Sequence, residues 1–314
     1  MNSKKKLFKI RCSAIGNIMT NPVGPTPMDK YLKCKESLEK HENDYKNMAN
    51  KDTKTAQNKL ERIMKLNDEL KELEKTKDEI VLSKTCIAYL EDWIKENYYW
   101  RKKQLHTNPI KKGIECENES IFVINKALWT KYVKSRYAEW EQMENDWCVW
   151  HEDIDDKDNK KTIDAKVSYS FDSFPIVKDE LENNYYWQWQ WYMWLKWEDY
   201  KKHEVIKVLV NTPAWQLRSL LYNTYNNVIK QYEETPEYID EEYEKIAKQI
   251  FLWHVFDKQL TINSDWAILE LTDDEVIPYD KRIHIFEIDR NDEDIEKIKK
   301  RVEECRIWLE QNWY

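Results

Sequence analysis

Apolar residues recur along much of the chain in steps of three and four, the spacing of one helix face. Residues 29–97 contain no Gly or Pro, and two charged runs within them carry such stripes. The stripes consist of Leu32, Leu38 and Tyr45, and then of Leu60, Ile63, Leu66, Leu70 and Leu73. A polar stretch at 47–55 lies between them. This pattern predicts a long antiparallel helical hairpin over 29–97, with solvated charged faces.

The rest of the chain mixes helical and extended patterns. Helical spacing recurs over 117–134, 213–231 and 238–254. A closing helix carries its stripe on Ile295, Ile298, Val302, Cys305 and Leu309. Alternating segments at 146–150 and 161–169, separated by the acidic residues 152–160, predict two strands joined by a hairpin turn. Further strands are predicted over 205–213 and 282–288, so the succession favours an α/β fold.

Composition excludes several chemistries. The 314 residues include only Gly16, Gly24 and Gly113 as glycines, which are too scattered for a dinucleotide-binding fingerprint or a phosphate-cradling loop. The 51 basic and 59 acidic residues give a formal net charge of -8, which argues against a polybasic protein held to nucleic acid by charge alone. Any contact with nucleic acid must therefore be local.

The six cysteines lie far apart and form no Cys-x-x-Cys pair, which excludes zinc ribbons, iron–sulfur clusters and thioredoxin-type chemistry. We therefore expect reduced thiols and a cytoplasmic location. No stretch approaches the roughly 20 apolar residues of a membrane span, so we expect no membrane partner.

One predicted strand contains the most informative pattern. Because a strand sends alternate side chains to opposite faces, Asp164 and Lys166 share one face while Ile163 and Ala165 pack on the other. An ion pair on an exposed face is one interpretation. Asp153 favours another, because the hairpin would bring its carboxylate beside Asp164. Two close carboxylates repel unless a cation lies between them, and an oxygen-only pair suits Mg²⁺ or Mn²⁺.

Other polar residues fall near this predicted cluster. Glu117, in the first turn of a predicted helix, is placed to supply a third acidic group. Asp155 and Asp156 compete with Asp153 for the role of second carboxylate. His151 is a candidate ligand or base, although an incidental polar side chain near a turn is the simpler interpretation.

The aromatic run at 185–195 carries two glutamines. Gln188 and Tyr192 are four residues apart and share a helix face, whereas Gln190 is turned by roughly 200° from Gln188. Only one of the two glutamines can therefore face the site. The tryptophans and tyrosines around them favour packing in the core over stacking on bases.

Five blocks of the sequence, in order, resemble the PD-(D/E)xK nuclease superfamily, and within it the phage-type exonucleases of the lambda and YqaJ-like recombinase kind. The blocks are IRCSAIGNIMTNP, GIECENESI, WHEDIDDKDNKKTIDAKVSYS, NYYWQWQWYMWL and VLVNTP. The resemblance implies an α/β nuclease core with a small central mixed sheet flanked by helices. This core would comprise residues 1–28 and 98–314, with the helical hairpin of 29–97 as an insertion.

The resemblance also implies roles for the acidic cluster. In such nucleases a helix Glu, a hairpin Asp and the Asp-x-Lys pair hold a metal and activate water. These roles carry over to Glu117, Asp153 and Asp164 as metal ligands, and to Lys166 as a catalytic residue. The family has Pro before the first Asp, where this chain has Glu152.

Two further motifs carry over from the same resemblance. The family's Gln-x-x-x-Tyr motif implies a catalytic role for Gln188, with Tyr192 beside it and Gln190 as the other candidate glutamine. Its early Arg and Ser imply a grip on a 5′-phosphate by Arg11 and Ser13.

The implied activity is that of a Mg²⁺- or Mn²⁺-dependent DNA exonuclease, acting 5′ to 3′ on linear double-stranded DNA in phage recombination. A homo-oligomer, trimeric in the lambda type, a single-strand annealing protein as partner and the host cytoplasm are implied in the same way. Two alternatives stay open, a catalytically silent DNA-binding or recombination-partner protein and an endonuclease of the same superfamily. Lysine pairs at 111–112, 160–161 and 201–202 are candidates for a local DNA track.

Overall fold

The computed structural model describes residues 6–103, 107–135, 143–150, 153–177, 183–196, 199–233, 235–260 and 269–313. The chain divides into two compact units. Unit 1 consists of Met1–Phe8, Gly16–Lys102 and Lys299–Tyr314, and unit 2 of Lys9–Ile15 and Lys103–Ile298. No helix in the described part of the chain is long and apolar enough to cross a membrane.

Helices account for most of the described residues. The α-helices are α1 (Ile15–Ile18), α2 (Pro27–Lys46), α3 (Lys54–Thr76), α4 (Lys84–Tyr99), α5 (Asn108–Glu115), α6 (Glu117–Leu128), α7 (Asn183–Leu195), α8 (Ala214–Gln231), α9 (Ile239–His254) and α10 (Asp292–Asn312). Short 3₁₀ turns are η1 (Cys12–Ala14), η2 (Pro236–Tyr238) and η3 (Tyr279–Lys281). Capping hydrogen bonds define where three of these helices begin. The side chains of Thr26, Thr53 and Ser83 each accept a hydrogen bond from a backbone N–H of the helix that follows.

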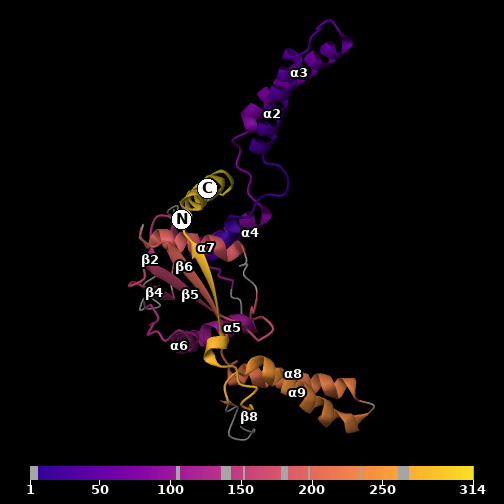
Figure 1. Cartoon of the computed structure of the whole chain (residues 1–314). Helices are drawn as coiled ribbons and strands as arrows, with labels where there is room; N and C mark the ends of the chain where they lie inside the picture. The colour runs from indigo at the N-terminus through magenta and orange to yellow at the C-terminus, as the bar shows by residue number, and fades with distance from the viewer. Residues whose placement is uncertain are drawn as a thin grey trace. The chain divides into compact units, whose positions relative to one another are not determined.

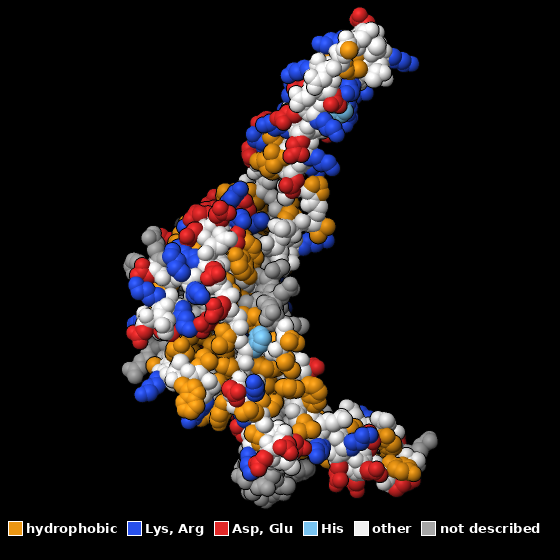
Figure 2. All heavy atoms as spheres, in the orientation of Figure 1, with side chains coloured by type: hydrophobic (Ala, Val, Ile, Leu, Met, Phe, Trp, Pro, Cys, Tyr) orange, Lys and Arg blue, Asp and Glu red, His pale blue; other side chains and the backbone are white. Residues whose placement is uncertain are grey.

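In unit 1, α2 and α3 lie side by side as an antiparallel pair (Figure 1). Their shared core consists of Cys34, Leu38, Ile63 and Leu66. Lys59 Nζ lies 2.8 Å from Asp44 Oδ2 near the connecting loop. At the far end the Lys77 ammonium lies 5.0 Å from the centroid of the Tyr31 ring. Blue and red side chains interleave over the surface of this pair (Figure 2), as expected for solvated charged faces.

The predicted stripes of this region were partly wrong. Leu32 and Leu60, which the spacing placed in the hairpin core, are 47% and 43% exposed. The α2 stripe runs through Cys34 instead. The helical region also contains a third helix, because α3 ends at Thr76 and α4 starts after the Ser83 cap. That the region is an insertion stays a prediction.

The strands of the described residues are β1 (Ile10–Arg11), β2 (Met143–Glu144), β3 (Cys148–Trp150), β4 (Ile154–Asp156), β5 (Lys161–Val167), β6 (Lys202–Val208), β7 (Gln259–Leu260), β8 (Leu269–Glu270) and β9 (Ile283–Asp289). They form a four-stranded sheet in the order β4-β5-β6-β9, a three-stranded sheet β1-β3-β2 and the pair β7-β8. In the four-stranded sheet β5 and β6 are parallel and the other pairs are antiparallel. Unit 2 therefore has an α/β architecture with a small mixed sheet.

The two faces of the four-stranded sheet differ. One face packs on α6 through an apolar cluster that includes Ile163, Ala165, Ile206 and Val208. The other face carries Asp164, whose Oδ2 accepts a hydrogen bond from the indole N–H of Trp189 in α7. Alternation along β5 thus directs Ile163 and Ala165 toward α6 and Asp164 toward α7, as the sequence predicted.

The strand partner predicted for β5 was wrong. Residues 148–150 form β3, which pairs with β1 and β2. The antiparallel partner of β5 is β4, which lies inside the acidic segment expected to be a turn. Ile154 is the apolar residue that anchors β4, because it lies opposite Ile163 and is 1% exposed.

The predicted helix boundaries agree with the structure more closely than the predicted strand pairing does. The helix predicted over 117–134 ends at Leu128, because Trp129 adopts a left-handed backbone conformation with φ of 56°. Helix α5, which precedes it, was not predicted. The stripe of the closing helix is confirmed, since Ile295, Ile298, Val302, Cys305 and Leu309 are all buried in α10.

The two leucines of α3 test the packing of the hairpin. Leu66 is 2% exposed and Leu60 is 43% exposed. Leu66→Ala should lower the free energy of unfolding by about 2–5 kcal/mol, because it leaves a cavity between α2 and α3. Leu60→Ala, the matched control, should change it by less than about 1 kcal/mol. Urea denaturation followed by circular dichroism measures both, and equal effects would contradict the observed orientation of α3.

Candidate active site

Asp164 and Lys166 form an ion pair on the face of the sheet that α7 covers. Lys166 Nζ lies 2.8 Å from Asp164 Oδ2, and Asp164 is 4% exposed. Burial acts to raise the pKa of Asp164, but the Lys166 ammonium and a hydrogen bond with Asp153 hold it well below its usual range. Burial acts to lower the pKa of Lys166, yet the charges of Asp164 and Asp153 hold it above its usual value. Both side chains are therefore charged.

Asp153 lies directly beside this pair. It immediately precedes β4, whose first residue Ile154 lies opposite Ile163, so the antiparallel register brings Asp153 next to Asp164. Its Oδ2 accepts a hydrogen bond of 2.9 Å from the backbone N–H of Ala165. Burial raises the pKa of Asp153 well above its usual range, and the negative charge of Asp164 raises it further. The two carboxyl groups therefore lie side by side in a buried position, where a cation would offset their mutual repulsion.

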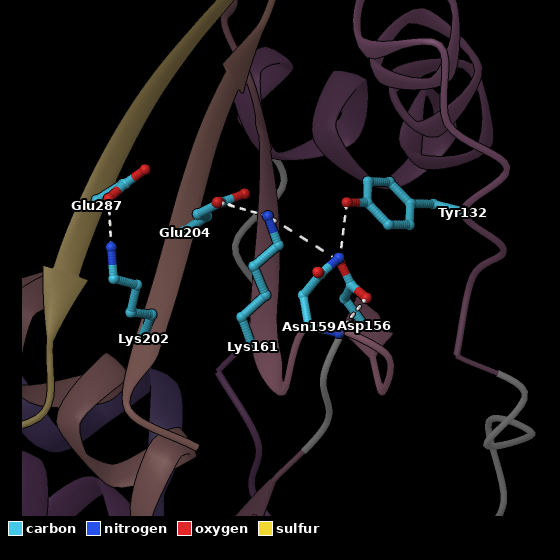
Figure 3. Close-up of polar contacts among 7 residues, drawn as sticks. All are labelled: Tyr132, Asp156, Asn159, Lys161, Lys202, Glu204 and Glu287. Carbon is cyan, nitrogen blue, oxygen red and sulfur yellow. Dashed lines mark hydrogen bonds and ion pairs between the residues drawn. The ribbon is translucent and has the colours of Figure 1, made fainter. Parts of the chain in front are cut away.

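The two neighbouring acids point elsewhere. Asp155 accepts hydrogen bonds of 2.8 Å from both Lys196 Nζ and Tyr200 OH. Asp156 accepts from Tyr132 OH at 3.0 Å and from Asn159 Nδ2 at 2.9 Å (Figure 3). Of the three candidate acids, Asp153 is therefore the one beside Asp164.

Glu117 approaches the cluster from the start of α6. Its Oε2 lies 2.8 Å from Lys134 Nζ, and its charge contributes to the raised pKa of Asp153. Within the ranges that the structure describes, no three His, Cys, Asp or Glu side chains lie together as a ready-made metal site. The donors of Asp153 and Asp164 fit a divalent cation by their chemistry, and Glu117 is held by Lys134. His151 and Glu152 lie outside the described residues.

Helix α7 supplies a contact that sequence analysis missed. The indole N–H of Trp189 donates to Asp164 Oδ2 at 3.3 Å, and Trp189 is 0% exposed. The indole is stacked between Tyr185, at 5.5 Å between centroids, and His203, also at 5.5 Å. His203 Nδ1 in turn shares a hydrogen bond of 2.6 Å with Thr162 Oγ1. The four-residue spacing of Tyr185 and Trp189 is the pattern from which this stack was predictable.

The two glutamines of α7 have different surroundings. Gln188 Nε2 donates to Tyr192 OH at 3.0 Å. Burial, then the nearby Cys12 and Asp164, raise the pKa of Tyr192 well above its usual value, so Tyr192 is close to the acidic cluster. Gln190 Nε2 donates to the Asp289 carbonyl at 2.7 Å, and its Oε1 accepts from the Asn291 N–H at 2.6 Å. Gln190 therefore joins α7 to the end of β9.

Arg11 and Ser13 lie at the start of unit 2. Arg11 ends β1, opposite Val149 of β3, and Ser13 is in η1, which packs against α7. Both side chains are exposed. They lie on the segment that contacts the helix of Gln188.

The expected lysine track is contradicted at Lys112. Lys112 is 0% exposed, and its Nζ donates to the Tyr169 carbonyl at 2.9 Å and to Thr212 Oγ1 at 3.1 Å. Burial lowers the pKa of Lys112 to about 8. Lys161 Nζ lies 2.6 Å from Glu204 Oε1, and Lys202 Nζ lies 3.0 Å from Glu287 Oε2 (Figure 3). These lysines are engaged within the protein, and Lys112 is out of reach of a ligand.

Comparison with known proteins identifies the fold. No family model matches the chain, and no curated protein matches it. A solved structure, that of a phage-related exonuclease from Haemophilus somnus 129PT, matches over 98% of this chain and 95% of its own, with a TM-score of 0.56 and 20% sequence identity. The chain therefore shares its α/β fold with a phage-related exonuclease, and the resemblance drawn from the sequence is confirmed at this level.

His254 gives a pH test of the buried cluster around Lys112. Burial, reinforced by the Lys112 charge, lowers the pKa of His254 from 6.5 to about 4. Between these values the unfolded chain binds a proton that the native protein does not, so the free energy of unfolding falls as pH falls. This residue should contribute a loss of about 2 kcal/mol between pH 7 and pH 5. Urea denaturation at both pH values should show a smaller loss for His254→Gln, and an identical loss would contradict the assignment.

Proposed function

We propose that this protein is a Mg²⁺- or Mn²⁺-dependent DNA exonuclease of the PD-(D/E)xK type. The observation that carries the proposal is the placement of Asp153, directly before β4, beside Asp164 and Lys166 of β5 in a small mixed sheet. Two carboxylates can hold a divalent metal, and a lysine beside them can stabilise the negative charge that develops during metal-assisted phosphodiester hydrolysis. The fold shared with a phage-related exonuclease supports the same conclusion.

The roles of the residues follow from their charges. Asp153 and Asp164 would hold the metal, with Glu117 as a third ligand once it leaves Lys134. When bound, the metal supplies positive charge to the phosphate oxygens and makes an attacking water more acidic. Lys166 orients that water and stabilises the charge that develops on the phosphate.

Residues of the surrounding elements complete the proposed site. Gln188, with Tyr192 as its partner, positions the phosphate or the water. The exposed Arg11 and Ser13 grip a 5′-phosphate, because a guanidinium fork and a hydroxyl suit a terminal phosphate group. This grip implies 5′ to 3′ digestion of linear duplex DNA, as in phage recombination.

Cleavage assays on linear duplex DNA test the proposal. Activity should require Mg²⁺ or Mn²⁺ and disappear with a chelator, while Ca²⁺ should support it poorly. Asp164→Asn and Lys166→Ala should each lower the cleavage rate by about a hundredfold or more, because each removes charge that the transition state needs. Lys161→Ala, on the opposite face of β5, should cleave like the wild type.

Several outcomes would contradict this assignment. Full activity in chelator would exclude the metal mechanism, and wild-type cleavage by Asp164→Asn would misplace the site. Cutting of covalently closed circular DNA would indicate an endonuclease. Binding without cleavage would indicate a silent DNA-binding protein. Release of a 3′ label before a 5′ label would reverse the proposed polarity.

The two glutamines give a matched pair of variants. Gln188→Ala should lower the cleavage rate at an unchanged melting temperature, because Gln188 lies with Tyr192 near the acidic cluster. Gln190→Ala should mainly lower the melting temperature, because it breaks two hydrogen bonds between α7 and the β9–α10 connection. Cleavage assays and thermal denaturation separate the two effects, and the reverse assignment would place Gln190 in the site.

The tryptophans of α7 give a second matched pair. Trp189→Phe keeps an aromatic ring in the stack but removes the N–H that donates to Asp164. Loss of such a partner of a metal ligand should lower metal affinity and cleavage by about tenfold. Trp191 is equally buried, but its N–H donates to Cys148 Sγ, so Trp191→Phe should retain both. Titration calorimetry with Mn²⁺ and cleavage rates measure the difference, and equal losses would mean that Trp189 acts through packing alone.

A further inference from the structure

A second lysine lies next to the Lys166 side chain on the neighbouring strand. Lys207 of β6 is the residue directly opposite Lys166 of β5. Opposite residues on parallel neighbours have side chains on the same face, about 4.8 Å apart at the backbone. Lys207 therefore projects from the same face as Asp164, the face that α7 covers.

One aromatic ring brings the two ammonium groups together. Lys166 Nζ lies 6.0 Å and Lys207 Nζ 5.5 Å from the centroid of the Tyr185 ring. The ring is itself fixed, because it stacks at an interplanar angle of 11° on Trp189, which is fully buried and bonded to Asp164. Attraction of each cation to the ring face offsets part of the repulsion between the two lysines.

The two lysines differ in their distance from the acidic cluster. Lys166 is ion-paired with Asp164 and belongs to the acidic cluster. Lys207 is half-buried, one strand further from β4, the strand that Asp153 precedes. A nucleic-acid strand carries one negative charge per phosphate, so a strand whose scissile phosphate lies at Lys166 presents its neighbouring phosphate to the next cation along the sheet.

We propose that Lys207, oriented by Tyr185, forms a binding subsite for the backbone phosphate adjacent to the scissile phosphate. The subsite takes a phosphodiester of a DNA strand and recognises charge, with no contact to bases. The inference rests on the proposed nuclease function and adds to it the direction in which the strand crosses the sheet, from β5 toward β6.

The test measures DNA binding in Ca²⁺, where cleavage is poor, by fluorescence anisotropy of a short linear duplex at several salt concentrations. Lys207→Met keeps the aliphatic stem and removes the charge. It should weaken binding by about tenfold and reduce the slope of log affinity against log salt by about one. Lys207→Arg, which keeps the charge, should bind within about twofold of the wild type.

Lys202→Met is the matched control. It lies on the same strand but on the opposite face of the sheet, and its side chain is 55% exposed, so its loss should change neither affinity nor slope. Melting temperatures of all variants check that each is folded. Lys207→Met with wild-type affinity and slope, or Lys202→Met with an equal loss, would overturn the subsite.

Substituted duplexes locate the contact. In each duplex one of the first few backbone phosphates from the end is replaced by an uncharged methylphosphonate. Substitution at one of these positions should weaken binding by the wild type but should not weaken binding by Lys207→Met any further. Additive losses at every position would contradict a direct contact. If the wild type cleaves linear duplex and Lys207→Met binds DNA as the wild type does, the subsite is excluded but the proposed function stands. If the wild type neither binds nor cleaves DNA, the proposed function is excluded as well.

Discussion

Unit 2 depends on one electrostatic constraint, the placement of two carboxyl groups side by side in a buried position. Asp153 and Asp164 meet because β4 and β5 are antiparallel and in register. Their repulsion is offset by Lys166, by the Ala165 N–H and by the Trp189 N–H. Burial and the charge of Asp164 raise the pKa of Asp153, whereas the Lys166 ammonium helps to hold the pKa of Asp164 below its usual range despite its burial.

The division of the sheet into two faces offsets the free-energy cost of burying these charged groups. Apolar residues of β5 and β6 pack on α6 and stabilise the sheet, which leaves the other face to hold charges beneath α7. The aromatic content of α7 serves this purpose, because its rings exclude water while single N–H groups reach polar atoms. Trp189 and Trp191 both do so, one to Asp164 and the other to Cys148.

Much of the site was predictable from local pattern. Alternation along one strand placed Asp164 and Lys166 together, and helical geometry separated Gln188 from Gln190. The partner strand was not predictable in this way, because strand pairing is set by distant contacts. The segment that forms β4 has Ile154 among charged residues and so has the composition of a turn. Periodicity likewise could not show that Lys112 is buried, since that depends on the positions of Tyr169 and Thr212.

We propose that Asp153 and Asp164 together bind a divalent metal. A crystal structure of the protein soaked in Mn²⁺, with anomalous diffraction data, tests it directly. An anomalous peak is expected between the carboxylate oxygens of Asp153 and Asp164, and it should be lost in Asp164→Asn. Absence of a peak at saturating Mn²⁺, or a peak at another site that persists in Asp164→Asn, would contradict it.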